Sequence, residues 1–256
     1  MSEAKSVLRT ENLGITFGGL KAVQNLNIDI REGELMGLIG PNGAGKTTVF
    51  NLLTGVYQPT SGKIFLNDKE IHAKKPHDMV RQGVARTFQN IRLFKELTVL
   101  DNVKAAFNGS MKYTTLEGVL RLPRYWKEEA EIDRKSRELL ALFGMEGLAD
   151  NIAANLPYGQ QRKLEIARAL ATNPKILLLD EPAAGMNPTE TAELMEAIAL
   201  IRNKYKLSIL LIEHDMSLVM GICERLVVID YGQVIATGLP AEIAQNKRVI
   251  GAYLGE

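Results

Sequence analysis

The stretch Gly40-Pro41-Asn42-Gly43-Ala44-Gly45-Lys46-Thr47 follows an apolar run, residues 35–39, and precedes a helix predicted over residues 45–54. It fits G-x-x-x-x-G-K-[ST] in the strand–helix context that this pattern requires. Glycines let the backbone curl so that several N–H groups point at phosphate oxygens, and the helix N-terminus adds the positive end of its dipole. Lys46 is expected to reach the outer phosphates, the Thr47 hydroxyl to bind Mg²⁺, and Thr48 to contact the nucleotide. The stretch predicts a phosphate-binding loop.

A second motif lies at Ile176-Leu177-Leu178-Leu179-Asp180-Glu181, where an apolar strand ends in two carboxylates. The strand is expected to deliver Asp180 to the edge of a sheet, where it can hold Mg²⁺ through water. Glu181 is then placed to act as a general base that orients and activates an attacking water. An apolar strand ending in Asp-Glu is common by itself, and it carries weight here because it follows the phosphate-binding loop.

The remaining apolar runs indicate the core of the fold. Strand-type runs lie at residues 208–212 and 226–229, and helices are expected at residues 189–205 and 216–222. Apolar strands that alternate with helices favour a mostly parallel sheet covered on both faces. The sequence therefore predicts an α/β fold around the phosphate-binding loop.

Two other parts of the chain depart from this alternation of apolar strands and helices. Residues 7–17, 22–30 and 63–66 are predicted strands, and the second of them alternates as a half-buried antiparallel strand does. Residues 128–143 have the spacing of an amphipathic helix. We expect an antiparallel β subdomain near the N-terminus and a helical subdomain at about residues 90–165, inserted in one domain that spans residues 1–256.

Charge and composition exclude several classes of protein. The 31 Lys and Arg residues against 30 Asp and Glu residues leave a net charge of +1, which gives no reason to expect nucleic acid as a partner. The single cysteine, Cys223, excludes an internal disulfide framework and is expected to be buried. No apolar run is long enough to cross a bilayer, and residues 1–11 lack the apolar core of a signal peptide. We expect a cytoplasmic chain, unless a partner holds it at a membrane.

A third motif lies between the first two, at Leu156-Pro157-Tyr158-Gly159-Gln160, where a helix is expected to begin. With it the chain resembles an ABC-type ATP-binding domain, a family that places an L-S-G-G-Q signature at a helix N-terminus shortly before the Asp-Glu strand. The resemblance implies ATP and Mg²⁺ as ligands and an α-helical subdomain that carries the signature. It also implies that the signature of one subunit covers the ATP of another, so that hydrolysis requires a dimer.

Three further residues match the family in the right order. Gln89 matches the glutamine that contacts Mg²⁺ and couples to the membrane partner, His214 the histidine that touches the γ-phosphate, and Phe17 the aromatic ring that stacks on adenine. His72 and His77 match nothing and are expected at the surface. The signature departs from the common form, because Pro157 stands where serine is usual and Tyr158 where the first glycine is usual. Proline has neither a hydroxyl nor an N–H group, so the contact between that serine and phosphate cannot form here.

A narrower resemblance comes from the form L-x-Y-G-Q-Q-R-x-L-E-I-A-R and from the ending Ala252-Tyr253-Leu254-Gly255-Glu256. Together these resemble the ATPase subunit of bacterial branched-chain amino-acid importers. That resemblance implies a second ATPase subunit, different from this chain or a second copy of it, two membrane permease subunits, and indirectly a periplasmic binding protein. It places the chain on the cytoplasmic face of the membrane as a peripheral subunit. Ile91, Leu93 and Phe94 follow Gln89, are expected to be partly exposed, and mark the place where a permease helix docks in this family.

Other functions are compatible with parts of this pattern. Importers of amides, urea or other amino acids share the same motifs, and no residue of this chain touches the solute. A non-transport ABC ATPase usually carries a long coiled-coil insertion or two cassettes, which this sequence lacks. A solitary kinase or GTPase with a phosphate-binding loop would have neither the signature nor His214.

Overall fold

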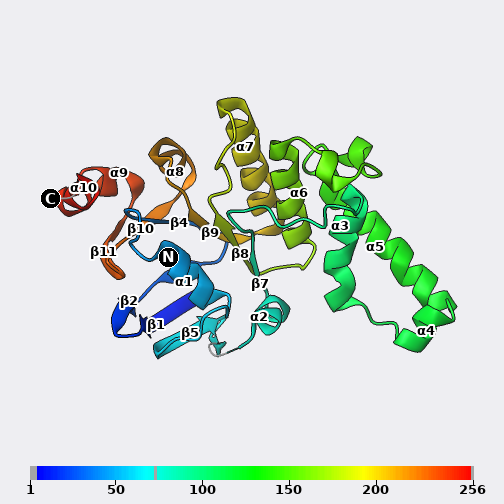
Figure 1. Cartoon of the computed structure of the whole chain (residues 1–256), viewed down its shortest axis with the longest axis horizontal. Coiled ribbons are helices and arrows are strands. Elements are labelled where there is room, and N and C mark those ends of the chain that lie inside the picture. The colour runs from blue at the N-terminus through cyan, green and yellow to red at the C-terminus, as the bar shows by residue number, and fades with distance from the viewer. Residues whose placement is uncertain (1–4, 72–73, 255–256) are drawn as a thin grey trace. The chain divides into compact units, whose positions relative to one another are not determined.

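The computed structural model describes residues 5–71 and 74–254, and the chain forms two compact units (Figure 1). His72, Gly255 and Glu256 lie outside the described residues. Unit 1 consists of Met1–Gln89, Lys175–Ala184 and Ile201–Glu256, and unit 2 consists of Asn90–Pro174 and Gly185–Leu200. Helix α7 (Pro188–Tyr205) belongs to both, since it begins in unit 2 and ends in unit 1.

The core of unit 1 is a six-stranded sheet in the order β11-β10-β4-β9-β8-β7. All neighbouring pairs are parallel except β10 and β11, which are antiparallel. Every residue of the three central strands is buried, as their continuous apolar sequences predicted. The strands are β4 (Leu35–Ile39), β7 (Val84–Arg86), β8 (Ile176–Asp180), β9 (Ser208–Ile212), β10 (Arg225–Asp230) and β11 (Gln233–Gly238).

The second sheet of unit 1 is antiparallel and has the order β2-β1-β5-β6, with β3 also paired to β1. The prediction of one continuous strand over residues 22–30 was wrong. The chain divides at residues 27–28 into two strands that both pair with β1, and Asn25, with a left-handed φ of 46°, lies at an irregularity in the register of the first of them. The strands are β1 (Ser6–Phe17), β2 (Leu20–Leu26), β3 (Asp29–Arg31), β5 (Ser61–Leu66) and β6 (Lys69–Glu70).

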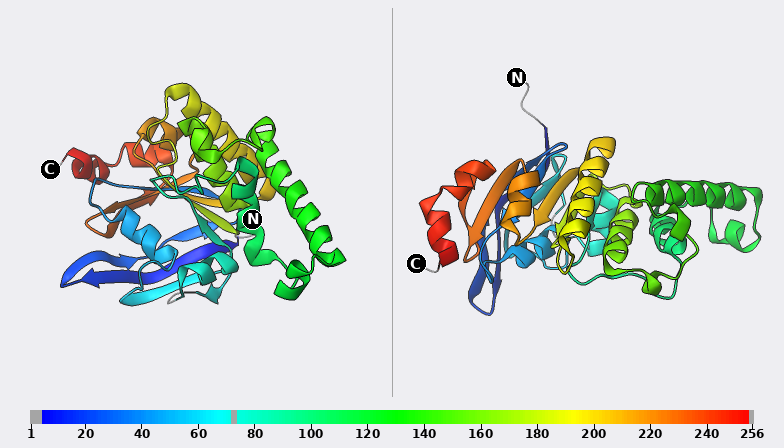
Figure 2. Two further views of the ribbon diagram at one scale, coloured as in Figure 1. Left: turned by 45° about the vertical axis from the view of Figure 1, so that its right-hand side comes forward. Right: turned by 90° about the horizontal axis from the view of Figure 1, so that it is seen from above.

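Helix α1 (Lys46–Leu53) lies between the two sheets, as the left view of Figure 2 shows. Its residues Val49, Phe50, Leu52 and Leu53 belong to one buried cluster with apolar side chains of both sheets. The first helical turn is thereby fixed in place from two sides, directly after β4. This arrangement sets the position of the loop between β4 and α1.

Helix α8 (Met216–Ile222) packs on β4 at Gly37, where a larger residue would have to displace neighbouring side chains. A Cβ atom on Gly37 would lie 2.6 Å from Leu226 Cδ2, 3.1 Å from Cys223 Sγ and 3.5 Å from a methyl group of Val219 in α8. Burial raises the pKa of the Cys223 thiol to about 12. The expected burial of Cys223 is confirmed. The other helices of unit 1 are α2 (Pro76–Gln82), α9 (Pro240–Ala244) and α10 (Lys247–Leu254).

Unit 2 is helical, and its core forms where α3, α5 and α6 pack on one another. Val99, Val103, Leu140 and Leu164 are buried there. Helix α5 begins five residues earlier than the sequence pattern indicated, because Pro123 suits the first turn of a helix. The elements are α3 (Val99–Ala106), η1 (Phe107–Ser110), α4 (Thr115–Val119), α5 (Pro123–Ala141), η2 (Glu146–Leu148), η3 (Ala153–Asn155), α6 (Tyr158–Leu170) and the first part of α7.

Within residues 5–71 and 74–254, no helix has both the length and the apolar character needed to cross a bilayer.

Candidate functional site

The loop between β4 and α1 is curled too tightly for side chains at two of its positions. A Cβ atom on Gly40 would lie 2.0 Å from the carbonyl oxygen of Ile229, and one on Gly45 would lie 2.9 Å from that of Ala22. Gly43 and Gly45 have φ angles of 81° and 105°, which glycine adopts without strain. No side chain caps the N-terminus of α1. The free N–H groups of the first helical turn and of the loop therefore form a site that suits an anion.

Lys46 lies inside this curl. Its ammonium group donates to the carbonyl oxygens of Gly40 at 2.6 Å and of Pro41 at 2.9 Å. Burial lowers the pKa of Lys46, and the negative charges of Glu181 and Asp180 oppose that shift. Thr47, the next residue, is exposed, and Thr48 is half-buried. The structure thus brings the loop, its lysine and the two carboxylates of the second motif into one electrostatic environment.

Asp180 ends β8 in a buried ion pair with Arg86, which the sequence did not indicate. Arg86 Nη2 lies 2.6 Å from Asp180 Oδ2, and both side chains are less than a tenth exposed. Nη1 of Arg86 donates to Asn51 Oδ1 of α1 at 2.7 Å. The guanidinium therefore ties the end of β8 to the helix that follows the loop.

Glu181 is held by two side chains from neighbouring segments. Gln89 Nε2 donates to Glu181 Oε2 at 2.6 Å, and His214 Nε2 lies 2.7 Å from Glu181 Oε1. Glu181 has a φ of 47°, which is unusual for a residue with a side chain and is typical of functional positions. Gln89 and His214 thus both contact Glu181, and the three predicted catalytic residues form one cluster.

Glu213 holds the backbone on either side of this cluster. Its carboxylate accepts hydrogen bonds from the N–H groups of Ala183 at 2.8 Å and His214 at 3.1 Å. Burial raises the pKa of Glu213 and the charge of Glu181 adds to this, while the two N–H donors lower it. Glu213 therefore fixes the backbone on both sides of the Glu181–His214 contact. It stands next to His214 in a run of polar residues after an apolar strand, and only that position could have drawn attention to it.

Phe17 lies at the end of β1 and is 43% exposed. Its ring meets that of Tyr57 edge to face, with centroids 5.2 Å apart. One face of such a ring can still stack on a flat aromatic ligand. His77, by contrast, is exposed and pairs with its neighbour Asp78, 3.4 Å away, as expected of a surface histidine.

The signature residues open α6 in unit 2. Pro157 is the N-cap residue of this helix, its carbonyl accepts from Gln161 N–H at 3.0 Å, and no side chain caps the helix. The helix that was expected to begin in this motif thus starts at Tyr158. A Cβ atom on Gly159 would lie 3.0 Å from Glu190 Oε1, so a larger residue would have to displace that carboxylate. Gln160 follows in the first turn, and Leu156 is buried.

Tyr158 takes the place of a glycine and has a structural partner. Its hydroxyl accepts a hydrogen bond at 3.1 Å from Arg162, which is fully buried and also pairs with Glu165 at 3.0 Å. The ring itself remains 43% exposed. The hydroxyl of Tyr158 is therefore held by a buried residue one turn further along α6, while its exposed ring lies next to Gly159.

The comparisons with known proteins agree with this geometry. Residues 23–184 match the profile of a family described as ABC transporter, and residues 233–256 match one described as branched-chain amino acid ATP-binding cassette transporter. The high-affinity branched-chain amino acid transport ATP-binding protein LivG of Salmonella typhimurium is 48% identical over 253 residues, with 99% of each chain covered. The corresponding protein BraF of Pseudomonas aeruginosa is 46% identical with the same coverage. The solved structure of an ABC transporter's ATP-binding cassette in its ADP conformation superposes with a TM-score of 0.84 at 32% identity, covering 98% of this chain and 99% of that one.

The ion pair at the end of β8 leads to a prediction about stability. Replacing Arg86 by Ala leaves the Asp180 carboxylate buried without its cation, and we expect a loss of about 3–5 kcal/mol in the free energy of unfolding. Urea denaturation of the purified chain measures it. The matched control is Lys63→Ala, which removes the cation of an exposed pair with Glu70 and is expected to cost about 0–1 kcal/mol. Equal losses in the two variants would contradict a buried pair at Asp180.

Proposed function

The chain belongs to the ABC transporter family, and on that premise we propose that it is the ATP-hydrolysing subunit of an importer for branched-chain amino acids. The observation that carries the proposal is the contact of Glu181 with both Gln89 and His214, beside the glycine-rich loop. The likeness to LivG and BraF over nearly the whole chain, together with the match of the C-terminal residues, supports the solute class. Both units then belong to a single ATPase domain.

ATP is the nucleotide that the family implies, and the loop accounts for how its phosphates are bound. The N–H groups of the glycine-rich loop and of the first turn of α1 surround the phosphates, and Lys46 exchanges its two carbonyl acceptors for phosphate oxygens. The exchange gives the ammonium group of Lys46 an anionic partner. Burial lowers the pKa of Lys46, so a partner that stabilises its charged form is favourable. Phe17 stacks on the adenine ring.

The donors near the loop fit Mg²⁺. Over the described part of the chain, no cluster of three or more His, Cys, Asp or Glu side chains could hold a metal ion by itself. Mg²⁺ in phosphate sites needs no such cluster, because it is bound by one or two carboxylates together with phosphate oxygens and water. Thr47, Asp180 and Gln89 supply a hydroxyl, a carboxylate and an amide oxygen, the hard ligands that this ion prefers. When bound, the ion neutralises charge that develops on the phosphates.

Glu181 is the general base in this proposal. One of its oxygens takes the proton of a water molecule that attacks the terminal phosphate, and Gln89 and His214 hold the carboxylate in place. His214, which follows β9, is positioned to contact the γ-phosphate. Its 45% exposed side chain leaves room for that approach.

The first functional prediction concerns this base. Glu181→Gln keeps the shape of the side chain but cannot accept the proton, so ATP still binds while hydrolysis falls by about 10²–10⁴-fold. Lys46→Ala instead weakens nucleotide binding itself. Nucleotide affinity and phosphate release of the assembled transporter distinguish the two variants. The control is Glu193→Gln, the same change at an exposed carboxylate paired with Lys163, which is expected to keep full activity; a fully active Glu181→Gln enzyme would sink the assignment.

The partners follow from the family and from the signature. We place a second ATPase subunit opposite this one, so that Gly159 and Gln160 of α6 cover the partner's ATP. Since Pro157 lacks the hydroxyl and the N–H group of the usual serine, the site that it covers has one contact fewer. A hydrogen bond to a charged group contributes about 1.5–3 kcal/mol, which makes that site the weaker of the two when the partner carries a complete signature.

This asymmetry predicts unequal effects of one substitution made in either subunit. Glu181→Gln here disables the site covered by the partner's signature, while the matching change in the partner disables the site covered by Pro157 and Tyr158. We expect the change in this chain to reduce ATPase activity of the intact transporter more. Equal losses would mean that the N–H groups of α6, which no side chain caps, replace the missing contact fully.

The segment after Gln89 supports a docking surface for the permease. Phe94 is 53% exposed and Leu97 is 39% exposed, whereas Ile91 and Leu93 are half-buried, so the expected partial exposure is confirmed. The backbone of Phe94 is fixed by the buried side chain of Asn102, which bonds its N–H and its carbonyl at 2.9 Å each. A fixed, exposed aromatic ring is typical of an interface anchor.

Phe94→Asp is therefore expected to abolish assembly with the permease subunits and to leave ATP affinity unchanged. Co-purification of the complex together with nucleotide binding by the free chain measures both. Tyr205→Asp is the matched control, because this aromatic ring is 45% exposed and lies in α7. The docking proposal fails if Phe94→Asp assembles as well as the control.

A further inference from the structure

Unit 2 carries an exposed apolar surface that the proposed function does not use. It lies on residues 112–127, which contain α4 and the start of α5 and which we call the tip (Figure 1). Five large apolar side chains are exposed there: Leu116 at 66%, Val119 at 74%, Leu120 at 59%, Leu122 at 40% and Trp126 at 56%. None of the residues of α4 is buried. An apolar group of this size on one corner marks an interaction surface.

The tip is ordered by its own hydrogen bonds. Thr114 and Glu117 form a reciprocal capping box at the start of α4, with N–H···O distances of 2.6 and 3.3 Å. Glu128 of α5 accepts from the N–H groups of Lys112 at 2.9 Å and Tyr113 at 3.2 Å. The rings of Tyr113 and Tyr125 meet edge to face at 5.3 Å. The apolar side chains are therefore presented by a structured corner.

The same segment is basic. It holds Lys112, Arg121, Arg124 and Lys127 against the single carboxylate of Glu117, whereas the chain as a whole carries a net charge of only +1. Arg124 is paired with Glu128 at 3.2 Å. Across the described residues, no carboxylate pairs with the ammonium groups of Lys112 and Lys127.

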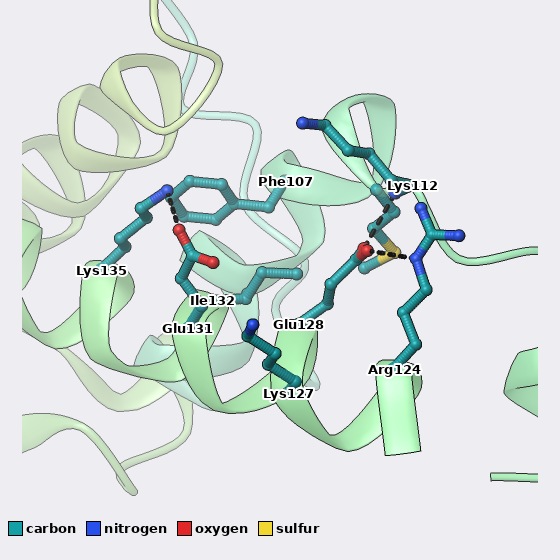
Figure 3. A pocket seen from close by; sticks show the side chains of 9 residues that line it. Phe107, Lys112, Arg124, Lys127, Glu128, Glu131, Ile132 and Lys135 are labelled. Atoms are coloured by element: carbon teal, nitrogen blue, oxygen red, sulfur yellow. Dashed lines mark hydrogen bonds and ion pairs between the residues drawn. The ribbon is translucent and has the colours of Figure 1, made fainter. Parts of the chain in front are cut away.

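These cations border a hollow of about 440 Å³ between η1 and α5 (Figure 3). Lys112, Arg124, Lys127 and Lys135 line it, with Glu128 and Glu131 as the acidic residues. Glu131 is paired with Lys135 at 2.6 Å, and the ammonium groups of Lys112 and Lys127 extend from opposite sides of Glu128 without a marked partner. The hollow has an excess of positive charge next to the exposed apolar side chains.

We propose that the tip binds the surface of a membrane rich in anionic lipids. A helical corner with exposed leucines, tryptophan and free basic residues has the composition of interfacial membrane-binding segments. Tryptophan and tyrosine favour the headgroup region, and lysine and arginine bind anionic headgroups there. A second copy of this chain is a poor occupant, because two basic tips repel each other. The proposal goes beyond the transport function and does not depend on which solute is carried.

A weak contact of this kind gains strength in the assembled transporter. Docking to a membrane-embedded partner raises the effective concentration of the tip at the lipid surface, so that modest intrinsic affinity is sufficient. The binding of the free chain to vesicles is therefore expected to be measurable, reversible and sensitive to salt.

Trp126 reports on this contact directly, because it is the only tryptophan of the chain. We expect its fluorescence to shift to shorter wavelength when the full chain is mixed with vesicles of phosphatidylcholine and phosphatidylglycerol. Flotation of the chain with these vesicles measures binding independently. Both signals are expected to be small with phosphatidylcholine alone. They are also expected to decline in 0.5 M salt, where the Debye length is about 4 Å, compared with about 10 Å at 0.1 M.

Two variants separate the contributions. Lys112→Gln with Lys127→Gln is expected to weaken binding by about 25-fold, since each basic residue near an anionic surface contributes about fivefold. Leu116→Ser with Leu120→Ser removes exposed apolar area and is expected to abolish the Trp126 shift without lowering thermal stability. The matched controls are Lys247→Gln with Arg248→Gln and Leu200→Ser, which change exposed residues outside the tip and are expected to bind as the wild type does.

The proposal is overturned if the wild-type chain neither floats nor shifts its fluorescence with anionic vesicles. It is also overturned if phosphatidylcholine binds equally well, or if the lysine variant binds like its control. If the wild-type chain does not bind vesicles and the variant Leu116→Ser with Leu120→Ser no longer assembles with the permease, the tip binds a protein partner instead. Unchanged nucleotide affinity of the isolated chain in every tip variant keeps this outcome separate from a failure of the proposed function.

Discussion

The site depends on a place where three backbone segments meet without room for a side chain. The N–H of Gly232 donates to the carbonyl of Ala44 at 2.9 Å, and its carbonyl accepts from Gln24 N–H at 2.8 Å. A Cβ atom on Gly232 would lie 2.3 Å from the carbonyl oxygen of Ala22. The turn after β10 thereby joins the loop of the parallel sheet to β2 of the antiparallel sheet. The curl of the loop is set by this tertiary contact as much as by its own glycines, so the second sheet is part of the nucleotide site.

The order of the strands explains why the catalytic residues converge. Parallel strands end at one edge of their sheet, and ligand sites form beyond their carboxyl ends. Because β8 lies between β7 and β9, the residue after β8 is reached from one side by the segment after β7 and from the other by the segment after β9. Glu181, Gln89 and His214 occupy those three positions. Their residue types could be matched from sequence, but their contact depends on strand order.

Local features were predictable from the sequence and distant pairings were not. Continuous apolar runs indicated the central strands, because strands that are buried on both faces consist mostly of apolar residues. The ion pair of Arg86 and Asp180 joins residues 94 positions apart, and β7, which carries Arg86, has only three residues. The break in the strand over residues 22–30 falls at residues 27–28, and the alternation of apolar residues does not reveal it. The role of Tyr158 was likewise hidden in the sequence, because its hydroxyl accepts a hydrogen bond from the buried side chain of Arg162.

The exposed groups of unit 2 that are proposed to bind a partner or a surface are held in place in the same way. Phe94 stands on a backbone held by buried Asn102, and Tyr158 is held by buried Arg162. The tip is held by the half-buried carboxylate of Glu128, which accepts from two of its N–H groups. In each case a polar side chain inside the unit fixes an apolar or aromatic group outside it. The entropy of ordering these groups is lost during folding, so a partner or surface that binds them does not have to supply it again. Removing the inner polar group should then weaken recognition even where the outer residue is intact, because the outer ring would have to be ordered at the moment of binding.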